Sequence, residues 1–331
     1  MAVHASLLHR LDIVSSVKWK VFAYDIPYVT RGSRQGLLVC FTSSDGKESW
    51  GEIAPFPGRS QETLDQALAQ LLQLLNSKQP DDEIFPSVQF GLESALSPQM
   101  PLSAPLYALL SGDPDAVLKQ AEAASAHGYS TVKLKVSSFP IAVAQKLIHT
   151  LKERFRIRVD CNSAFSFDEA MSLFSPFPQE IFDYIEDPTY ELQHLPAFSH
   201  PFALDETVQR YASLPIAEYR NLYGFILKPT VLGGEKGCRS IVEFAQKRGL
   251  KIVFSCAFES GLGLLQILKL ASRFNLVSDP LGLDTYRHLK QDLLKSPVDF
   301  STPYLTVDRE PEINLELLRE IADGTSELPS F

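Results

Sequence analysis

Five short apolar stretches of this chain each end in a charged side chain, and they follow one another at nearly regular intervals. The charged residues are, in chain order, Lys135, Asp160, Glu186, Asp205 and Lys228. The steps between them are 25, 26, 19 and 23 residues, enough for one strand, one helix and two loops. Because parallel strands need crossovers of this size, the series predicts consecutive strand–helix units.

In a (β/α)₈ barrel, residues at the carboxyl ends of successive strands converge on one site. The series therefore predicts a site in which Asp160, Glu186 and Asp205 meet, flanked by lysines. Three carboxylates without partners would repel one another, so a hard divalent cation is the simplest occupant. Mg²⁺, which prefers octahedral oxygen coordination, fits such ligands.

The lysines add a candidate base. Lys133 and Lys135 are two residues apart, so both point to the same face of their strand, and Lys135 is nearer the strand end. Lys228 follows a strand beyond the carboxylates and is expected to approach from the opposite side. A lysine near other cations has a lowered pKa and can remove a proton near neutral pH. A cation can stabilise the charge left on a carboxylate whose α-proton has been removed.

Each of these residues also has an ordinary structural explanation when it is taken alone. An acidic residue after a strand often caps a helix, and a Lys-x-Lys pair is typical of an exposed edge strand. Five such residues in order, each at a strand end, favour a shared site over independent caps.

Length and composition exclude several classes of protein. The chain has 331 residues, 45% of them hydrophobic, which fits a barrel of about 250 residues plus a further domain. A formal net charge of −9 argues against a nucleic-acid partner, and no apolar run approaches the roughly 20 residues of a membrane span. The first 16 residues lack the pattern of a signal peptide. The scattered cysteines, which indicate free thiols and a cytoplasmic location, are Cys40, Cys161, Cys238 and Cys256. Strand alternation predicts that the Cys161 side chain points away from the site.

The chain divides by pattern into two parts. Residues 15–56 read as antiparallel strands with an Asp-Gly turn, and two helices follow, the first introduced by Ser60, Glu62 and Thr63. We expect an α+β capping domain over residues 1–100 and a barrel over 101–299. The tail from about residue 300 to 331 has no barrel role and is expected to pack with the first domain.

The strand-end residues together resemble the motif set of the enolase superfamily, in particular its muconate-lactonising subgroup. That set has Lys-x-Lys on the second barrel strand, Asp, Glu and Asp on the third to fifth, and Lys on the sixth. Other segments resemble o-succinylbenzoate synthases more closely. WGEIAPFPGRSQETLDQA is similar to their substrate-capping loop and following helix, FPSVQFGLESAL to the next helix, and SCAFESGLGLLQ and GLDT to the seventh- and eighth-strand segments.

This resemblance implies a modified (β/α)₇β TIM-like barrel with an N-terminal α+β capping domain. It implies the Mg²⁺-dependent dehydration of 2-succinyl-6-hydroxy-2,4-cyclohexadiene-1-carboxylate to o-succinylbenzoate in menaquinone biosynthesis, with Mn²⁺ as a substitute ion. Lys135 would remove the α-proton and protonate the departing hydroxyl, Lys228 would stabilise the enolate as a cation, and Lys133 would support Lys135. The metal ligands would be Asp160, Glu186 and Asp205.

The resemblance also suggests residues that contact the substrate or lie beside the ligands. They are Asn162, Glu206, Pro57, Gly58, Ser60, Ser255, Glu259, Ser260, Gly282 and Asp284. Two positions depart from the family pattern. Cys161 stands where a small alanine is more usual, and Arg59 lies in the capping loop where some relatives have an apolar residue.

Two alternatives stay open at this point. An N-succinylamino acid racemase or dipeptide epimerase of the same superfamily also requires lysines on opposite faces, although such epimerases usually carry Asp-x-Asp on the eighth strand. The corresponding DPLGLDTYRH does not clearly supply that pair. A non-catalytic barrel that binds a metabolite is an alternative of another class, which the complete set of bases and ligands disfavours. Exchange of the α-proton with solvent would distinguish it from either enzyme. The small-molecule substrate is expected to be a carboxylate in every case.

Overall fold

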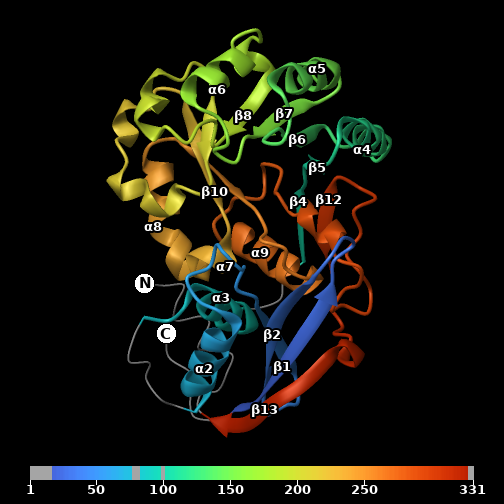
Figure 1. Ribbon diagram of the computed structural model, residues 1–331. Helices are drawn as coiled ribbons and strands as arrows, with labels where there is room; N and C mark the ends of the chain where they lie inside the picture. The colour runs from blue at the N-terminus through green and yellow to red at the C-terminus, as the bar shows by residue number, and fades with distance from the viewer. Residues whose placement is uncertain (1–16, 77–82, 98–100, 327–331) are drawn as a thin grey trace.

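An antiparallel sheet with two helices forms the lower part of the molecule, and a barrel of parallel strands forms the upper part (Figure 1). The computed structural model describes residues 17–76, 83–97 and 101–326. The expectation that the first 16 residues lack a signal peptide concerns residues outside this description. Within the described residues, no helix has the length and apolar character needed to cross a membrane.

The lower sheet has the order β13-β1-β2-β3, with every neighbouring pair antiparallel. The Asp-Gly turn expected from the sequence joins β2 to β3. Gly46 has a φ of +83°, which glycine adopts readily, and its N–H donates to the Ser43 carbonyl. The strands are β1 (Val17–Pro27), β2 (Ser33–Thr42), β3 (Glu48–Ile53) and β13 (Leu318–Ser326).

Two helices pack against this sheet. α2 (Leu64–Leu75) begins after the N-cap Thr63, which forms a reciprocal capping box with Gln66. α3 (Pro86–Ala95) lies closest to β3. Apolar side chains of the sheet and both helices form a cluster separate from the main core of the barrel.

Seven parallel strands form the curled sheet of the upper part, and each lies beside the strand that precedes it in the chain. Lys135, Asp160 and Glu186 are the last residues of their strands, and Asp205 and Lys228 follow theirs directly. The strands are β5 (Ala108–Leu110), β6 (Thr131–Lys135), β7 (Arg156–Asp160), β8 (Phe182–Glu186), β9 (Phe202–Leu204), β10 (Leu222–Leu227) and β11 (Lys251–Phe254).

The eighth strand of the barrel is reduced to two residues, Leu281 and Gly282. Leu281 forms a parallel bridge to Leu106, just before β5, and Gly282 forms one to Ser255, just after β11. Four backbone hydrogen bonds hold these two residues between their neighbours. This short connection closes the ring, so the fold is the modified (β/α)₇β barrel with an N-terminal capping part that the sequence predicted.

Two crossovers differ from the expected strand–helix unit. Short 3₁₀ turns replace the helix after β8 and after β9, and proline explains part of this, because Pro196 lies inside one turn and Pro215 precedes another. These turns span Leu192–Ala197, Val208–Ser213 and Ile216–Glu218. The α-helices of the barrel are α4 (Pro114–Ala126), α5 (Ile141–Leu151), α6 (Phe167–Phe174), α7 (Pro229–Leu232), α8 (Gly234–Lys247) and α9 (Gly261–Arg273).

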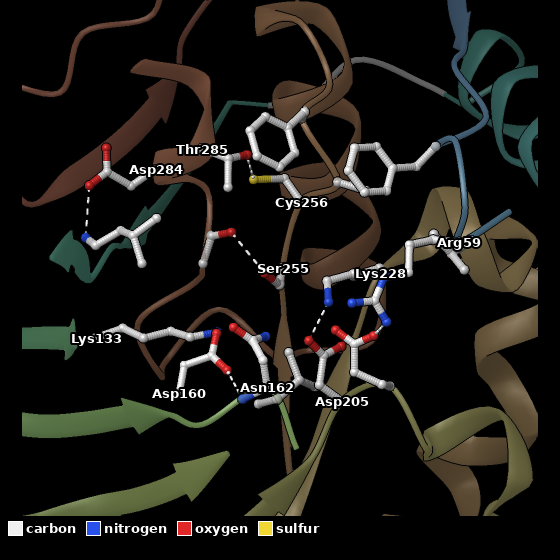
Figure 2. A pocket seen from close by; sticks show the side chains of 18 of the residues that line it. Arg59, Lys133, Asp160, Asn162, Asp205, Lys228, Ser255, Cys256, Asp284 and Thr285 are labelled. Atoms are coloured by element: carbon white, nitrogen blue, oxygen red, sulfur yellow. Dashed lines mark hydrogen bonds and ion pairs between the residues drawn. The ribbon is translucent and has the colours of Figure 1, made fainter. Parts of the chain in front are cut away.

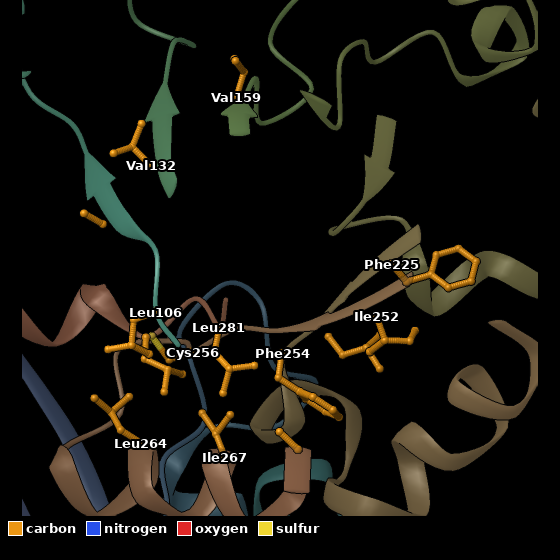
Figure 3. Close-up of a cluster of buried hydrophobic side chains, with 14 of the residues drawn as sticks. Leu106, Val132, Val159, Phe225, Ile252, Phe254, Cys256, Leu264, Ile267 and Leu281 are labelled. Carbon is orange, nitrogen blue, oxygen red and sulfur yellow. The ribbon is translucent and has the colours of Figure 1, made fainter. Parts of the chain in front are cut away.

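Strand alternation separates the apolar core from the polar interior of the barrel. Val132 and Val159 belong to the large cluster that includes the buried faces of the surrounding helices, as Figure 3 shows for part of it. Their chain neighbours Lys133 and Asp160 therefore point inward, toward the barrel axis. Cys161 is fully buried in the apolar cluster, on the side expected from the same alternation.

The end of the chain leaves the barrel and joins other elements. β12 (Tyr304–Val307) pairs with β4 (Leu102–Pro105), which precedes the first barrel strand. β13 then pairs with β1 at the edge of the lower sheet. The domain limits proposed from the sequence, residues 1–100 and 101–299, stay a prediction.

A buried carboxylate joins the two parts of the molecule. Glu52 of β3 is 1% exposed, and it accepts hydrogen bonds from the Tyr24 hydroxyl and from three groups at the start of α9. Those groups are the Ser260 N–H at 3.0 Å, the Ser260 hydroxyl at 2.6 Å and the Gly263 N–H at 2.8 Å. A Cβ at Gly263 would lie 2.6 Å from the Glu52 Oε2, so only glycine permits this approach. The negative charge also suits a helix N-terminus.

Replacing Glu52 with Gln should destabilise the whole protein. The groups around this carboxylate all donate hydrogen bonds, so the NH₂ group of Gln would face donors and find no acceptor. We expect the free energy of unfolding to fall by about 1–3 kcal/mol. Urea denaturation followed by circular dichroism measures the change. Glu48→Gln, on the same strand but exposed, is the matched control and should leave stability nearly unchanged. Equal stabilities of the two variants would contradict this role of Glu52.

Candidate active site

A cavity of about 590 Å³ lies at the carboxyl ends of the barrel strands, beneath the loop that follows β3 (Figure 2). Both strand ends and loops supply charged residues to its lining, and apolar residues of strands, loops and the short helix that follows the sixth strand complete it. Among the residues predicted as catalytic or metal-binding, the cavity wall contains Lys133, Lys135, Asp160, Asp205 and Lys228. The parallel arrangement of β6 to β10 brings these together although 95 residues separate the first from the last.

Lys133 is the most buried lysine of the site and lies between two carboxylates. Its Nζ is 3.0 Å from the Asp160 Oδ2 and 2.6 Å from the Glu186 Oε1. Burial disfavours the charged ammonium, but the two carboxylates outweigh burial and raise the pKa of Lys133 well above its usual value. Lys133 is therefore a fixed cation.

Lys135 and Lys228 are the two lysines with more access to the cavity. Lys135 has a side chain 41% exposed and an Nζ 3.8 Å from the Asp160 Oδ2, so it is only loosely paired. Lys228, just after β10, forms an ion pair and hydrogen bond with Asp205. Burial works against the charge of Lys228, yet Asp205 and Glu186 raise its pKa above the usual value. Lys228 is thus held in its charged form by its partners, and Lys135 is the freer of the two.

Glu186 lies behind the cavity wall, fully buried at the end of β8. One of its carboxylate oxygens pairs with Lys133, whereas the other, Oε2, has no hydrogen-bond partner among the described residues. Burial and the nearby charges of Asp160 and Asp205 raise the pKa of Glu186 well above its usual value. A buried carboxylate oxygen without a partner is costly, so a ligand at this position would relieve it.

The three carboxylates suit a hard cation by their chemistry. All donors are carboxylate oxygens from adjacent strand ends, and the orphaned Oε2 of Glu186 is the group that a divalent ion would complete. Among the described residues, no three acidic, histidine or cysteine side chains are gathered as a ready-made metal cage. The lysines are paired with the carboxylates instead, so ion binding requires the ammonium group of Lys133 to shift away from Glu186.

Asp187 has a structural part in the site that the sequence did not predict. Asp187 follows Glu186, has a φ of +41°, and accepts hydrogen bonds from the N–H groups of Asp205 and Glu206 at 3.2 and 3.0 Å. It fixes the end of β9 relative to the end of β8. Burial and the Asp205 carboxylate raise the pKa of Asp187 to about 7. The sequence feature that could have identified Asp187 is its position directly after Glu186, a predicted metal ligand.

The loop after β3 reaches over the cavity and contacts the barrel. Gly58 and Arg59 line the cavity, and Arg59 forms an ion pair with Glu206, next to Asp205 (Figure 2). Arg59 is half exposed, whereas Glu206 is mostly buried. Arg59, the residue that departs from the family pattern, therefore links the loop to the barrel.

The other predicted contact residues divide into two groups. Asn162, Ser255, Gly282 and Asp284 line the cavity, with the Asp284 carboxylate accepting from the Leu109 N–H at 2.8 Å. Four residues do not line it: Pro57, Ser60, Glu259 and Ser260. Their polar groups are engaged elsewhere, since the Ser60 hydroxyl accepts from a backbone N–H in its own loop, and Glu259 and Ser260 are fully buried at the base of α9.

Apolar and aromatic residues of the cavity were not anticipated. Phe56 and Phe258 come from two different loops, Tyr107 from the segment before β5, and Ile226 from β10. Charged motifs attract attention in a sequence because they are rare in apolar runs. Aromatic residues in loops cannot be recognised as site residues in this way, because aromatic residues are equally common in ordinary hydrophobic cores.

Comparisons with known proteins agree with this geometry. A family model described as the MenC N-terminal domain matches residues 20–98, and one described as enolase C-terminal domain-like matches residues 116–320, more than half of the chain. The o-succinylbenzoate synthase of Proteus mirabilis is 30% identical over 317 residues, covering 88% of this chain and 97% of that protein. The chain belongs to the o-succinylbenzoate synthase family of the enolase superfamily.

Solved structures of this superfamily share the fold. The o-succinylbenzoate synthase of Thermosynechococcus elongatus, solved with magnesium in its active site, has a TM-score of 0.70 and 24% identity, covering 85% of this chain and 96% of that chain. The L-Ala-D/L-Glu epimerase of Bacillus subtilis has a TM-score of 0.75 and 17% identity, covering 94% and 100%. The fold alone thus accommodates both reactions, and the choice between them depends on the site.

Replacing Glu186 with Gln should weaken Mg²⁺ binding without unfolding the protein, because the amide keeps the shape but removes the charge. We expect the dissociation constant for Mg²⁺, measured by isothermal titration calorimetry, to rise by at least about tenfold. The exposed Glu180→Gln is the control and should bind Mg²⁺ like the parent protein. Unchanged Mg²⁺ affinity in the Glu186 variant would exclude this carboxylate as a ligand.

Proposed function

We propose that this chain catalyses the Mg²⁺-dependent dehydration of 2-succinyl-6-hydroxy-2,4-cyclohexadiene-1-carboxylate to o-succinylbenzoate, a step of menaquinone biosynthesis. The observation that carries the proposal is the position of Lys135 and Lys228 in one cavity with the strand-end carboxylates, in a chain of this family. The free, buried cysteines among the described residues are consistent with the reducing cytoplasm that we propose as its location.

Asp160, Glu186 and Asp205 would hold the Mg²⁺ ion. When bound, this ion supplies positive charge beside the ring carboxylate and so stabilises the negative charge that develops there. Lys133, displaced from Glu186 but still beside Asp160, would add a second positive charge on the same side. Asn162 lies at the cavity wall beside Asp160, whose Oδ1 accepts from the Asn162 N–H at 3.1 Å.

Lys135 is the proposed base and acid. In its neutral form the amine takes the proton from the ring carbon next to the carboxylate, and the C–H electrons move toward that carboxylate. The same ammonium then returns a proton to the hydroxyl at the neighbouring carbon, whose C–O bond breaks and releases water. The product ring is aromatic, which makes the elimination favourable. Lys228 needs only its positive charge near the developing enolate.

The dipeptide epimerase alternative gains no support at the eighth strand. Position 282 is glycine, and Asp284 already accepts from the Leu109 N–H and pairs with Arg287 at 3.6 Å. The family match favours the synthase over both the epimerase and the racemase.

The test of the proposed function is an assay of the purified protein with Mg²⁺ and the cyclohexadiene substrate, beside a panel of dipeptides and N-succinylamino acids. Turnover of the panel without dehydration would overturn the proposal.

The two lysines should respond differently to substitution by arginine. Arginine keeps a positive charge but does not release its proton at working pH. Lys228→Arg should therefore retain more dehydration activity than Lys135→Arg, for which we expect kcat to fall by at least about a hundredfold. A 1,1-proton transfer needs both lysines as proton carriers, so both variants would then be equally inactive. Comparing kcat of the two variants on both substrate classes decides between the reactions.

The loop over the cavity should act as a lid. Residues 55–61 contain proline and glycine, and Arg59 links them to Glu206 across the cavity. Arg59→Met should raise KM by about threefold to tenfold, because a partly exposed ion pair is worth about 1 kcal/mol. Lys47→Met is the control, because it removes an exposed ion pair with Glu310 just before the start of β3, at the end of that strand away from the lid. Identical kinetics for both variants would show that this ion pair does not close the lid.

A further inference from the structure

Arg34 lies where the lower sheet meets the barrel, and the mechanism above does not use it. It stands near the start of β2 and is 2% exposed. Its guanidinium donates to carbonyls of two separate loops. Ala54 and Pro55 (at 2.7 Å) belong to the loop after β3 that continues into the lid, and Phe258 (at 3.1 Å) and Ala257 (at 3.4 Å) belong to the loop after β11. Because the five N–H groups of arginine have fixed directions, this one side chain sets the position of both loops.

Phe258 has an unusual backbone conformation at this junction. Its φ is +64°, a left-handed value that bulky residues rarely adopt. Its carbonyl is held by Arg34, and its ring lies parallel to that of Phe56, with centroids 5.4 Å apart and planes 3° apart. The ring of Tyr28 meets it edge-on at 5.8 Å. A residue stays in such a conformation only where several contacts impose it, and such residues gather at functional sites.

The two stacked rings face the cavity. Phe56 and Phe258 both line it, and Phe258 is the one residue from 252 to 271 that is not buried. The Arg34 guanidinium also lies over the Phe56 ring, at 5.6 Å from its centroid. One ring therefore comes from the lid, the other from the barrel, and Arg34 contacts the loops of both.

We propose that Phe56 and Phe258 form an aromatic wall that binds the uncharged middle of the substrate, its six-membered ring and the methylene groups of its succinyl chain. Arg34 is the positioning residue that holds this wall in place. The inference rests on the proposed function, whose substrate has charged ends and an apolar middle. The lysines and carboxylates of the site suit the ring carboxylate, whereas the wall offers the apolar surface that such ligands usually bury. The wall would thus determine affinity for the substrate, not the rate of proton transfer.

Phe258→Gly is the principal test, because glycine accepts a φ of +64° and keeps the loop conformation while removing the ring. We expect KM for dehydration and the dissociation constant for o-succinylbenzoate, measured by calorimetry with saturating Mg²⁺, to rise about tenfold. We expect kcat to stay within about threefold and Mg²⁺ affinity to be unchanged. Tyr28→Leu is the matched control, since Tyr28 touches Phe258 but does not line the cavity. Its constants should stay within about twofold of the parent.

Arg34→Lys tests the positioning role. Lysine keeps the charge, but one ammonium group cannot hold four carbonyls in two loops, so KM should rise about as in Phe258→Gly. In the Phe258→Gly background the same change should raise KM by less than about a further twofold, because the wall is already lost. Effects that multiply would show that Arg34 acts through something else. If Arg34→Lys does not fold, the Phe258→Gly comparison decides alone.

The outcomes separate the wall from the reaction. If the parent protein dehydrates the substrate and Phe258→Gly has the same KM and product affinity as the parent, the proposal of an aromatic wall is wrong and the proposed function stands. An equal loss in Tyr28→Leu would also overturn the wall. If the parent binds o-succinylbenzoate but does not dehydrate the substrate, the proposed function fails, and the binding comparison still decides whether the wall exists.

Discussion

Buried charge is the constraint on which the rest of this structure depends. β6, β7 and β8 each direct charged side chains toward the barrel axis, and no isolated charge is stable in such an interior. Lys133 is held between Asp160 and Glu186, and Arg158 is paired with Asp183 between the rings of Tyr107 and Tyr184. These ion pairs join β6 to β7, β6 to β8 and β7 to β8, so the strands that form the barrel also bring the site residues together.

The same pairing explains how one site can hold different lysines in different roles. Two carboxylates keep Lys133 charged, and Asp205 does the same for Lys228. Lys135 has only a distant contact to Asp160 and is the most exposed of the three. The neighbours of each lysine, rather than the lysine itself, thus support the roles proposed above, with Lys135 as the proton carrier and the other two as fixed positive charges.

The parts of the fold that could be predicted from the sequence are those with a local signal. Alternation in TVKLKV and IRVDCN places lysine and aspartate on the inner face, and β6 and β7 confirm it. The regular steps between strand ends order β6 to β10 in the sheet. The apolar spacing of IAVAQKLIHTL likewise predicts a helix, and α5 begins at Ile141.

What could not be predicted depends on contacts between distant segments. Two bridges at Leu281 and Gly282 define the eighth strand, which has no strand-like pattern of its own. Glu52 and Arg34 look like ordinary polar residues of two sheet strands, yet each is buried by loops or helices more than 200 residues away. Asp187 follows the same rule, because its partners lie just after the next strand. Local pattern shows which residues face inward, but only the folded chain shows what they meet.

The pairing of β13 with β1 has a consequence for the order in which the protein is built. β1 begins at residue 17 and its outer partner ends at residue 326, so the lower sheet contains both ends of the described chain. A ribosome releases β1, β2 and β3 long before β13 exists. During synthesis β1 is therefore an exposed edge, with unpaired N–H and C=O groups that other chains can contact. The sheet is completed last, after every barrel strand has been made, and that long interval is the period in which misassembly is most probable.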